Sequence, residues 1–343
     1  MNITIQDHEK NQKKLLISLS PEDMKPYLQS AAQARGKNIT IKGFRKGAAP
    51  YDVLEKSIGK EALWHEASAD AIEQSYGEAL KKHNLQPVGN PRVDITKSVP
   101  GNNFEFSVLV PLEPAFELPQ YREIARDIVK KNKKTEITVD EHEVEEALNT
   151  LAKSRSTQGE DKEVKLDDEF AKSMGAFKTL EHLKESIREG IRKEQEQQRV
   201  EALRLKIIEA IRKETSMEVA DLLIDNELTR MRDDLERHVA SLDMSFDDYL
   251  KKAGQTREQL NENWKDKAKG RVEASFILKA IADAEDINPS SEEIEEHANR
   301  YLSGFDSPEQ AESSIHPDVL RSHIRGMIRN DKVFNFLEKG DST

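Results

Sequence analysis

Apolar residues recur with two different spacings, and the change from one to the other divides the chain near residue 115. Before this point, apolar and polar residues alternate in four short segments, which predicts β-strands. The alternation is clearest between Phe104 and Val110. The strands are predicted at residues 2–6, 13–19, 92–97 and 103–110.

Two helices are predicted between these strands. Ser20 and Pro21 are followed by two acidic residues, the usual start of a helix, and this helix is expected to run to about Arg35. Apolar residues at helical spacing predict a second helix over about 60–84. Together these elements predict a small α+β domain over residues 1–115.

From Thr138 onward the spacing is that of helices alone. Thr138 and Glu141 have the spacing of a capping box, which predicts a helix start there. Further helices are predicted at 179–213, 219–242, 246–252, 257–284, 291–302 and 317–337. The longest is polar on all sides between residues 192 and 199, so we expect it to project as an arm. This predicts an all-α helical domain with projecting arms over residues 138–343.

Two segments break these patterns. Three prolines between Pro111 and Pro119 predict an extended connector, which we place at residues 116–137. Residues 154–164 are polar and contain Gly159, which predicts a linker inside the helical part.

Composition narrows the class of protein. The chain has 343 residues, a formal net charge of −12 and no cysteine. The absence of cysteine excludes a disulfide framework, thiolate zinc sites and cysteine catalysis. No segment approaches the roughly 20 apolar residues of a membrane span, and the amino terminus lacks the layout of a signal peptide. We expect a cytoplasmic protein without membrane contact.

The charge is unevenly distributed. Residues 1–115 have a net charge of +1, and the remainder has −13. The segment from Met24 to Tyr51 contains six basic residues and no acid. This suggests one site for a polyanion on an otherwise acidic protein, but a solvated basic face is the commoner reason for such a pattern.

Residues 42–50 combine this positive charge with an aromatic ring. Gly43, Gly47 and Pro50 predict a loop. Phe44 lies between Lys42 and Arg45, an arrangement that offers apolar contact among phosphate-binding cations. The alternative is a turn whose phenylalanine points inward, the commoner position of a single Phe.

Motifs of catalysis are absent from the sequence. There is no G-x-S-x-G elbow, Walker loop, G-x-G-x-x-G loop or H-E-x-x-H helix. His316 and His323 are seven residues apart, but Pro317 lies between them, which argues against a metal site there. We therefore assign no catalytic residue, no cofactor and no metal.

The loop Gly43-Phe44-Arg45-Lys46-Gly47-Ala48-Ala49-Pro50 resembles the G-F-R-x-G-x-x-P signature of the trigger factor family, bacterial chaperones that dock at the ribosomal exit tunnel. The segments 60–64 and 87–91 are also similar to that family. Lys42 and Ala48 depart from it, because Pro and Lys are common at these positions. The resemblance covers the amino-terminal domain and the helical domain.

The resemblance implies a site and partners. Gly43, Phe44, Arg45, Lys46 and Gly47 would contact protein and RNA of the large ribosomal subunit. Lys42 and Arg35 would support them. The other partners would be nascent or unfolded polypeptides and, for the free protein, a weak homodimer. The implied function is an ATP-independent chaperone that shelters nascent chains.

The segment between Arg122 and Glu169 departs from typical trigger factors, which carry a prolyl isomerase domain of roughly 90 residues. This segment has no Phe, Tyr or Trp, so an aromatic proline-binding pocket cannot be built from it. We predict that the isomerase domain and its activity are absent. The alternatives are a retained isomerase activity and a helical holdase or scaffold that does not bind ribosomes.

Large, flexible apolar side chains in the helices are candidates for substrate contact, although ordinary core positions are commoner for such residues. We call these residues the substrate pool: Met217, Leu222, Met231, Met244, Phe246, Phe276, Met327, Phe334 and Phe336.

Overall fold

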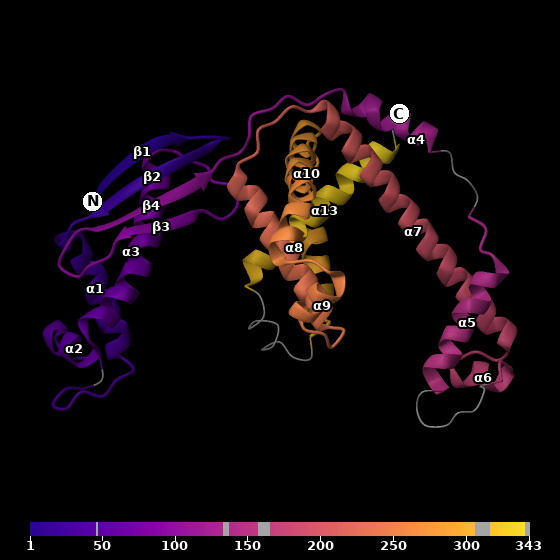
Figure 1. Ribbon diagram of the computed structural model, residues 1–343, viewed down its shortest axis with the longest axis horizontal. Coiled ribbons are helices and arrows are strands. Elements are labelled where there is room, and N and C mark those ends of the chain that lie inside the picture. The colour runs from indigo at the N-terminus through magenta and orange to yellow at the C-terminus, as the bar shows by residue number, and fades with distance from the viewer. Residues whose placement is uncertain (46, 133–136, 157–164, 306–315, 340–343) are drawn as a thin grey trace. The chain divides into compact units, whose positions relative to one another are not determined.

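The computed structural model describes residues 1–45, 47–132, 137–156, 165–305 and 316–339 (Figure 1). Their packing forms two compact units. The first contains residues 1–117 and 215–277, and the second contains 118–214 and 278–343. Residues 215–277 therefore pack with the amino-terminal part, whereas the sequence groups them with the other helices. The domain limits at 115 and 137 stay a prediction.

The first unit begins with a four-stranded antiparallel sheet in the order β1-β2-β4-β3. The strands are β1 (Asn2–His8), β2 (Gln12–Leu19), β3 (Arg92–Lys97) and β4 (Phe104–Pro111), so all four predicted strands are confirmed. β4 is a central strand and is buried along most of its length. In the register, Ile17 lies opposite Phe106, and Leu15 lies opposite Val108.

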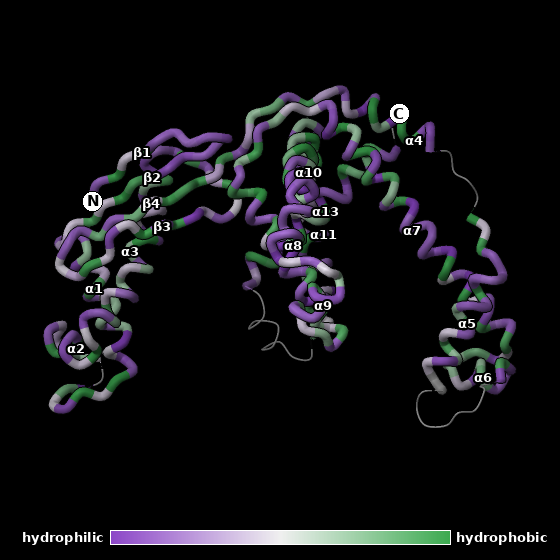
Figure 2. Tube along the Cα trace, viewed as in Figure 1, coloured by the Kyte–Doolittle hydropathy of each residue, from purple (hydrophilic) through white to green (hydrophobic). Residues whose placement is uncertain are grey.

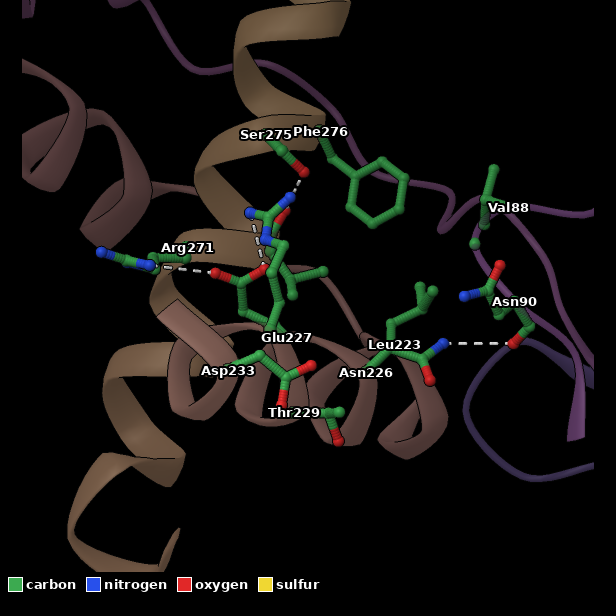
Figure 3. Close-up of a pocket in the computed structure, with 13 residues that line it drawn as sticks. Val88, Asn90, Leu223, Asn226, Glu227, Thr229, Asp233, Arg271, Ser275 and Phe276 are labelled. Atoms are coloured by element: carbon green, nitrogen blue, oxygen red, sulfur yellow. Dashed lines mark hydrogen bonds and ion pairs between the residues drawn. The ribbon is translucent and has the colours of Figure 1, made fainter. Parts of the chain in front are cut away.

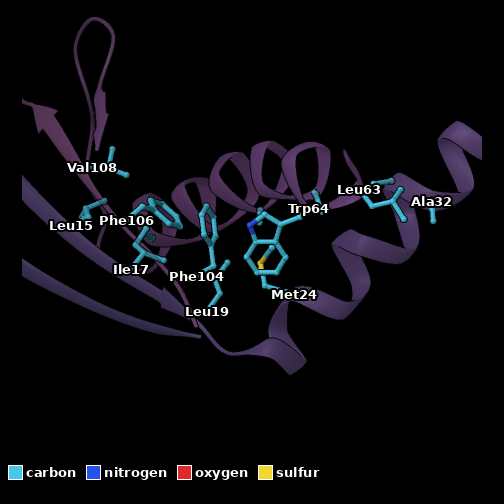
Figure 4. Packing of buried hydrophobic residues seen from close by; sticks show 14 of the residues in the cluster. Leu15, Ile17, Leu19, Met24, Ala32, Leu63, Trp64, Phe104, Phe106 and Val108 are labelled. Atoms are coloured by element: carbon cyan, nitrogen blue, oxygen red, sulfur yellow. The ribbon is translucent and has the colours of Figure 1, made fainter. Parts of the chain in front are cut away.

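Helices α1 (Pro21–Gly36), α2 (Tyr51–Ile58) and α3 (Lys60–Lys82) supply the rest of this core. Ser20 caps α1 as predicted, because its hydroxyl accepts from the Asp23 N–H and its own N–H donates to the Asp23 carboxylate. The Trp64 ring meets Phe104 edge-on at 5.9 Å (Figure 4). Its indole N–H donates to the Ser98 hydroxyl at 2.9 Å. We call residues 1–117 the amino-terminal module.

The first unit also contains α8 (Asp221–Ala240), α9 (Phe246–Ala253) and most of α10 (Arg257–Ala284). α8 and α10 pack through an apolar cluster that includes Leu223, Met231 and Phe276. Val88 and Phe116 of the amino-terminal module lie against the same cluster. This contact joins the module to the two helices.

The second unit is helical. It contains α4 (Tyr121–Lys131), α5 (Glu141–Ser156), α6 (Asp168–Ser173), α7 (Leu180–Glu214), α11 (Ser291–Leu302) and α13 (Pro317–Lys339). α5 and α6 pack on the first turns of α7 around Leu148, Phe170 and Leu183. α4 and α13 pack near its other end, where Ile207 and Ile211 are buried.

The middle of α7 matches the predicted arm. Residues 192–199 are hydrophilic (Figure 2), and most of them are exposed. The contact made there is polar, since the Gln195 amide donates to the Glu143 carboxylate at 3.1 Å. An α+β domain followed by helices with a projecting arm is thus confirmed as the fold class.

Two local predictions were wrong, and one helix was not predicted. The segment 116–137 is not extended throughout, because α4 lies within it and buries Ala125. α2 was missed, since its eight residues bury only Leu54. The helix start predicted at Thr138 is shifted by two residues: the His142 N–H donates to Asp140, whose own N–H donates to Glu143. Most of the linker predicted at 154–164 lies outside the described residues.

Candidate functional site

The loop between α1 and α2 is fixed at its base. The Gly47 N–H donates to the Gly36 carbonyl at the end of α1, at 3.0 Å. Ile39 and Ile41 are half-buried against the core of the amino-terminal module. The Phe44 N–H donates to the Ile41 carbonyl at 3.1 Å and closes a turn. The module therefore holds the loop at both ends of residues 41–47.

Two glycines make the turn possible. Gly43 has φ of 93° and Gly47 has φ of 77°, in the region that L side chains rarely adopt. A Cβ at Gly43 would meet nothing within 4 Å, so the backbone conformation rather than space requires glycine there. The two glycines of the sequence motif are thus explained by the shape of the loop.

The tip of the loop is open to solvent. The Phe44 side chain is 41% exposed, so the alternative of an inward-pointing ring does not hold. Lys42 and Arg45 are also exposed, and among the described residues neither forms an ion pair. The result is an aromatic ring between two cations that have no acidic partner in the described structure. We call residues 42–47 the cationic loop.

The two other predicted residues differ from this pattern. Arg35 Nε donates to the Glu66 carboxylate at 2.7 Å, so its charge is already paired. The guanidinium has further N–H groups, so Arg35 can support a polyanion while it keeps this pair, with its charge partly neutralised. Lys46 lies outside the described residues.

The structure divides the substrate pool by burial. Leu222, Met231 and Phe276 are buried, and Met231 and Phe276 belong to the core between α8 and α10. These positions favour a core role for the three residues. The half-buried members are Met217, Met244, Phe246, Phe334 and Phe336. Met327 is 58% exposed.

Some half-buried members have partners of their own. The guanidinium of Arg257 lies over the Phe246 ring, that of Arg204 over Phe334, and that of Arg122 over Phe336. Cations placed on ring faces in this way stabilise the local packing. Met327 is therefore the member of the pool that the structure leaves most open.

Met327 lies in an apolar groove between α11 and α13 that the sequence did not reveal. The groove has a volume of about 670 Å³. Its apolar lining residues are Tyr301, Val319, Leu320, Ile324, Met327 and Ile328. Val319 and Met327 are eight residues apart on α13 and are both 58% exposed, beside the buried Leu320 and Ile324. Val319 and Met327, two apolar residues about two helical turns apart beside the core positions, were the signal that could have found it.

The remaining described residues do not add a further chemical site. In the ranges that the structure describes, no three metal-binding side chains converge. No helix in these ranges is long and apolar enough to cross a membrane.

Comparisons with known proteins agree with this architecture. Residues 1–151 match the family described as bacterial trigger factor protein, and residues 179–339 match the family described as its C-terminus. The chain is 24% identical to the trigger factor of Halothermothrix orenii, with 98% of each chain covered. It is 23% identical to that of Syntrophomonas wolfei, covering 98% of this chain and 96% of the relative.

A solved structure is also similar to this chain. It comes from work on promiscuous substrate recognition in the folding and assembly activities of the trigger factor chaperone. The TM-score is 0.51 at 19% identity, and 99% of each chain is covered. At this identity the likeness supports the fold alone.

An α+β module with a fixed, exposed loop, followed by long helices, defines the architecture of a ribosome-associated chaperone. The two family matches together take in well over half of the chain, and the chain belongs to the trigger factor family.

Proposed function

We propose that the chain docks on the large ribosomal subunit through the cationic loop. The observation that supports this is the exposed Phe44 between Lys42 and Arg45 on a loop with a fixed base. Cations can neutralise phosphates of RNA or pair with acidic protein side chains, and the ring supplies contact area. A fixed base reduces the entropy that binding costs.

Co-sedimentation with ribosomes across a salt series tests this proposal. The parent chain is compared with a variant in which Phe44, Arg45 and Lys46 are all changed to Ala. We expect salt-sensitive binding by the parent and none by the variant. Equal binding by both proteins would mean that the loop is only a turn, and that docking uses another surface.

The second part of the proposed function is the sheltering of nascent polypeptides. The groove between α11 and α13 supports it, because an unfolded chain exposes apolar segments that an open apolar surface can cover. Met side chains adapt to varied partners. Such holding needs no ATP, and the sequence has no phosphate-binding loop.

The proposed function does not include prolyl isomerase activity. Residues 152–178, which separate the two family matches, are too few to form a domain core of their own. The alignment with the Halothermothrix orenii protein spans 428 positions and this chain has 343 residues, so at least 85 positions have no counterpart here. Both observations support the loss of a domain.

A proline-limited refolding assay separates this proposal from a retained isomerase. We expect the slow refolding phase of a proline-containing substrate to keep its uncatalysed rate at every concentration of the chain. A concentration-dependent acceleration would restore the enzyme alternative.

Docking at the exit tunnel would place the chain in the cytoplasm, with ribosomal RNA as a second contact. A weak homodimer would occupy the apolar surfaces of the free protein.

A further inference from the structure

Two turns of the amino-terminal module form polar contacts with the start of α8 and the residues just before it. The Lys10 ammonium bonds both carboxylate oxygens of Asp221, at 2.7 and 2.8 Å. The Asn11 amide donates to the Glu218 carbonyl at 2.8 Å. On the next turn of α8, the Asn226 amide donates to the Asn90 carbonyl at 3.1 Å (Figure 3).

Both turns have backbone conformations that L side chains rarely adopt, and Lys10 and Asn11 lie in the hairpin turn between β1 and β2. Lys10 and Asn11 have φ values of 54° and 55°, which few residues other than glycine adopt. Gly89 has φ of 71°, and a Cβ there would lie 2.8 Å from Leu223 Cδ2. The turn can approach α8 this closely only because residue 89 has no side chain.

The contact is narrow. Beside Gly89 and Leu223 lies a cavity of about 590 Å³ between the 88–90 turn, α8 and α10. The buried Glu227 lines this cavity and forms ion pairs with two other lining residues, Arg230 at 2.8 Å and Arg271 at 3.2 Å. Val88 and Phe116 pack on the apolar cluster of α8 and α10 beside this cavity. The polar contacts and the close approach at Gly89 add to that packing and fix where the two turns lie on α8.

We infer that this joint positions the cationic loop relative to α8 and α10, so that docking of the loop also orients these helices. We call the contacts of residues 10–11 and 88–90 with 218–226 the module joint. Lys10, Gly89 and Asn226 are its positioning residues. The role in docking rests on the proposed function, whereas the geometry of the joint does not.

Distance measurements between two spin labels test the joint directly. The chain has no cysteine, so Gln74→Cys on α3 and Asn263→Cys on α10 give specific labelling at exposed positions. Double electron–electron resonance on this pair reports the distance between α3 of the module and α10, and the width of its distribution shows how far that distance varies. For the parent we expect a single narrow distance distribution.

The joint is broken by Gly89→Ala combined with Lys10→Glu. The first change pushes on Leu223, and the second places two carboxylates together. The matched control is Gly101→Ala, since Gly101 has φ of 82° and a Cβ there would meet nothing within 4 Å. We expect the distribution to become at least twice as wide in the joint variant and to stay unchanged in the control. A further pair of variants tests the charges alone. Lys10→Glu by itself should widen the distribution, and Lys10→Glu with Asp221→Lys, which restores an opposite-charge pair, should narrow it again. General damage to the fold would not be reversed in this way.

A broad distribution in the parent, or the parent's distribution in the joint variant, would overturn the inference. Ribosome co-sedimentation of the same variant keeps the two proposals apart. We expect its affinity for ribosomes to stay within about twofold of the parent, because the cationic loop is untouched. Loss of docking by the Phe44, Arg45 and Lys46 variant is measured separately and does not depend on the joint.

Discussion

The amino-terminal module and the α11–α13 pair differ in how completely they bury their apolar side chains. In the module, Leu15, Phe104 and Val108 are fully covered, and the loop at its edge presents the single ring of Phe44. Between α11 and α13, a small core around Ala298 and Ile324 leaves Tyr301, Val319 and Met327 open. The module has a large buried core and an exposed aromatic ring on a fixed loop, besides apolar residues such as Ile95 on its edge strand β3. The α11–α13 pair has a small core and a groove lined by exposed apolar residues.

This difference shows how one chain can bind one partner specifically and many other partners without specificity. A single anchor on a rigid support suits one partner of fixed shape, because little entropy is lost on binding. A broad apolar groove with a Met side chain suits many partners, because its contacts do not depend on an exact shape. The structure therefore supports separate sites for docking and for holding.

The largest effect is expected from the core of the module. Phe106→Ala removes a buried ring from β4 and leaves a cavity, so it should lower the free energy of unfolding by about 3–5 kcal/mol. Met327→Ala, at an exposed position, should change it by less than about 0.5 kcal/mol. Chemical denaturation of both variants measures the contrast. Similar losses would show that the groove is as tightly packed as the module.

The next effect concerns the cationic loop. Phe44→Ala removes the proposed anchor and should weaken ribosome binding about thirtyfold, the value of a binding hot spot of about 2 kcal/mol. Arg45→Ala should also weaken binding and in addition lower the slope of log K against log salt by about 1, because one phosphate contact is lost. Binding isotherms at four salt concentrations separate the two. An unchanged slope in Arg45→Ala would place its contact on protein rather than RNA.

A smaller effect is expected from the groove. Val319→Gln with Met327→Gln replaces exposed apolar surface by polar amide groups, which should weaken binding of an unfolded polypeptide about tenfold. Leu205→Gln on α7 is the matched control, because Leu205 is exposed but lies outside the groove. Suppression of aggregation of a refolding substrate is the readout. Equal loss in the control would mean that general surface hydrophobicity, not the groove, holds the substrate.

The smallest effect is a change of stability at high pH. Burial and a hydrogen bond to Glu55 raise the pKa of Tyr51, at the start of α2, to about 12. The unfolded tyrosine titrates near 10. The protonated phenol therefore favours the folded state below pH 10, and this contribution is lost as the pH rises from about 10 to 12. Denaturation curves of Tyr51→Phe should show a smaller loss over this range, and an identical loss would refute the assignment.

Much of the fold follows from local sequence patterns. The helices at Arg257–Ala284 and Ser291–Leu302 begin and end where the sequence predicts, because caps and breakers lie beside long periodic segments. α2 and α4 were missed because short helices next to proline have too few periodic positions. The packing of residues 215–277 with the module was also missed, because contacts such as Gly89 with Leu223 join residues far apart in sequence.

The cationic loop and the groove between α11 and α13 also differ in how far the sequence alone predicts them. The cationic loop is a local motif, so its glycines, ring and charges could be interpreted before the structure was known. The groove depends on which face of α13 is covered by α11, and Tyr301 and Val319 gave no sign of exposure on their own. The substrate pool illustrates the limit, since it contains both the buried Met231 and the exposed Met327.

The separation of docking from holding is tested most directly by two measurements on each of two variants. The loop variant is Phe44→Ala with Arg45→Ala, and the groove variant is Val319→Gln with Met327→Gln. Ribosome affinity and suppression of aggregation in the absence of ribosomes are measured for both. The account predicts that the loop variant loses only ribosome affinity and that the groove variant loses only suppression of aggregation. Loss of both activities in either folded variant would contradict it.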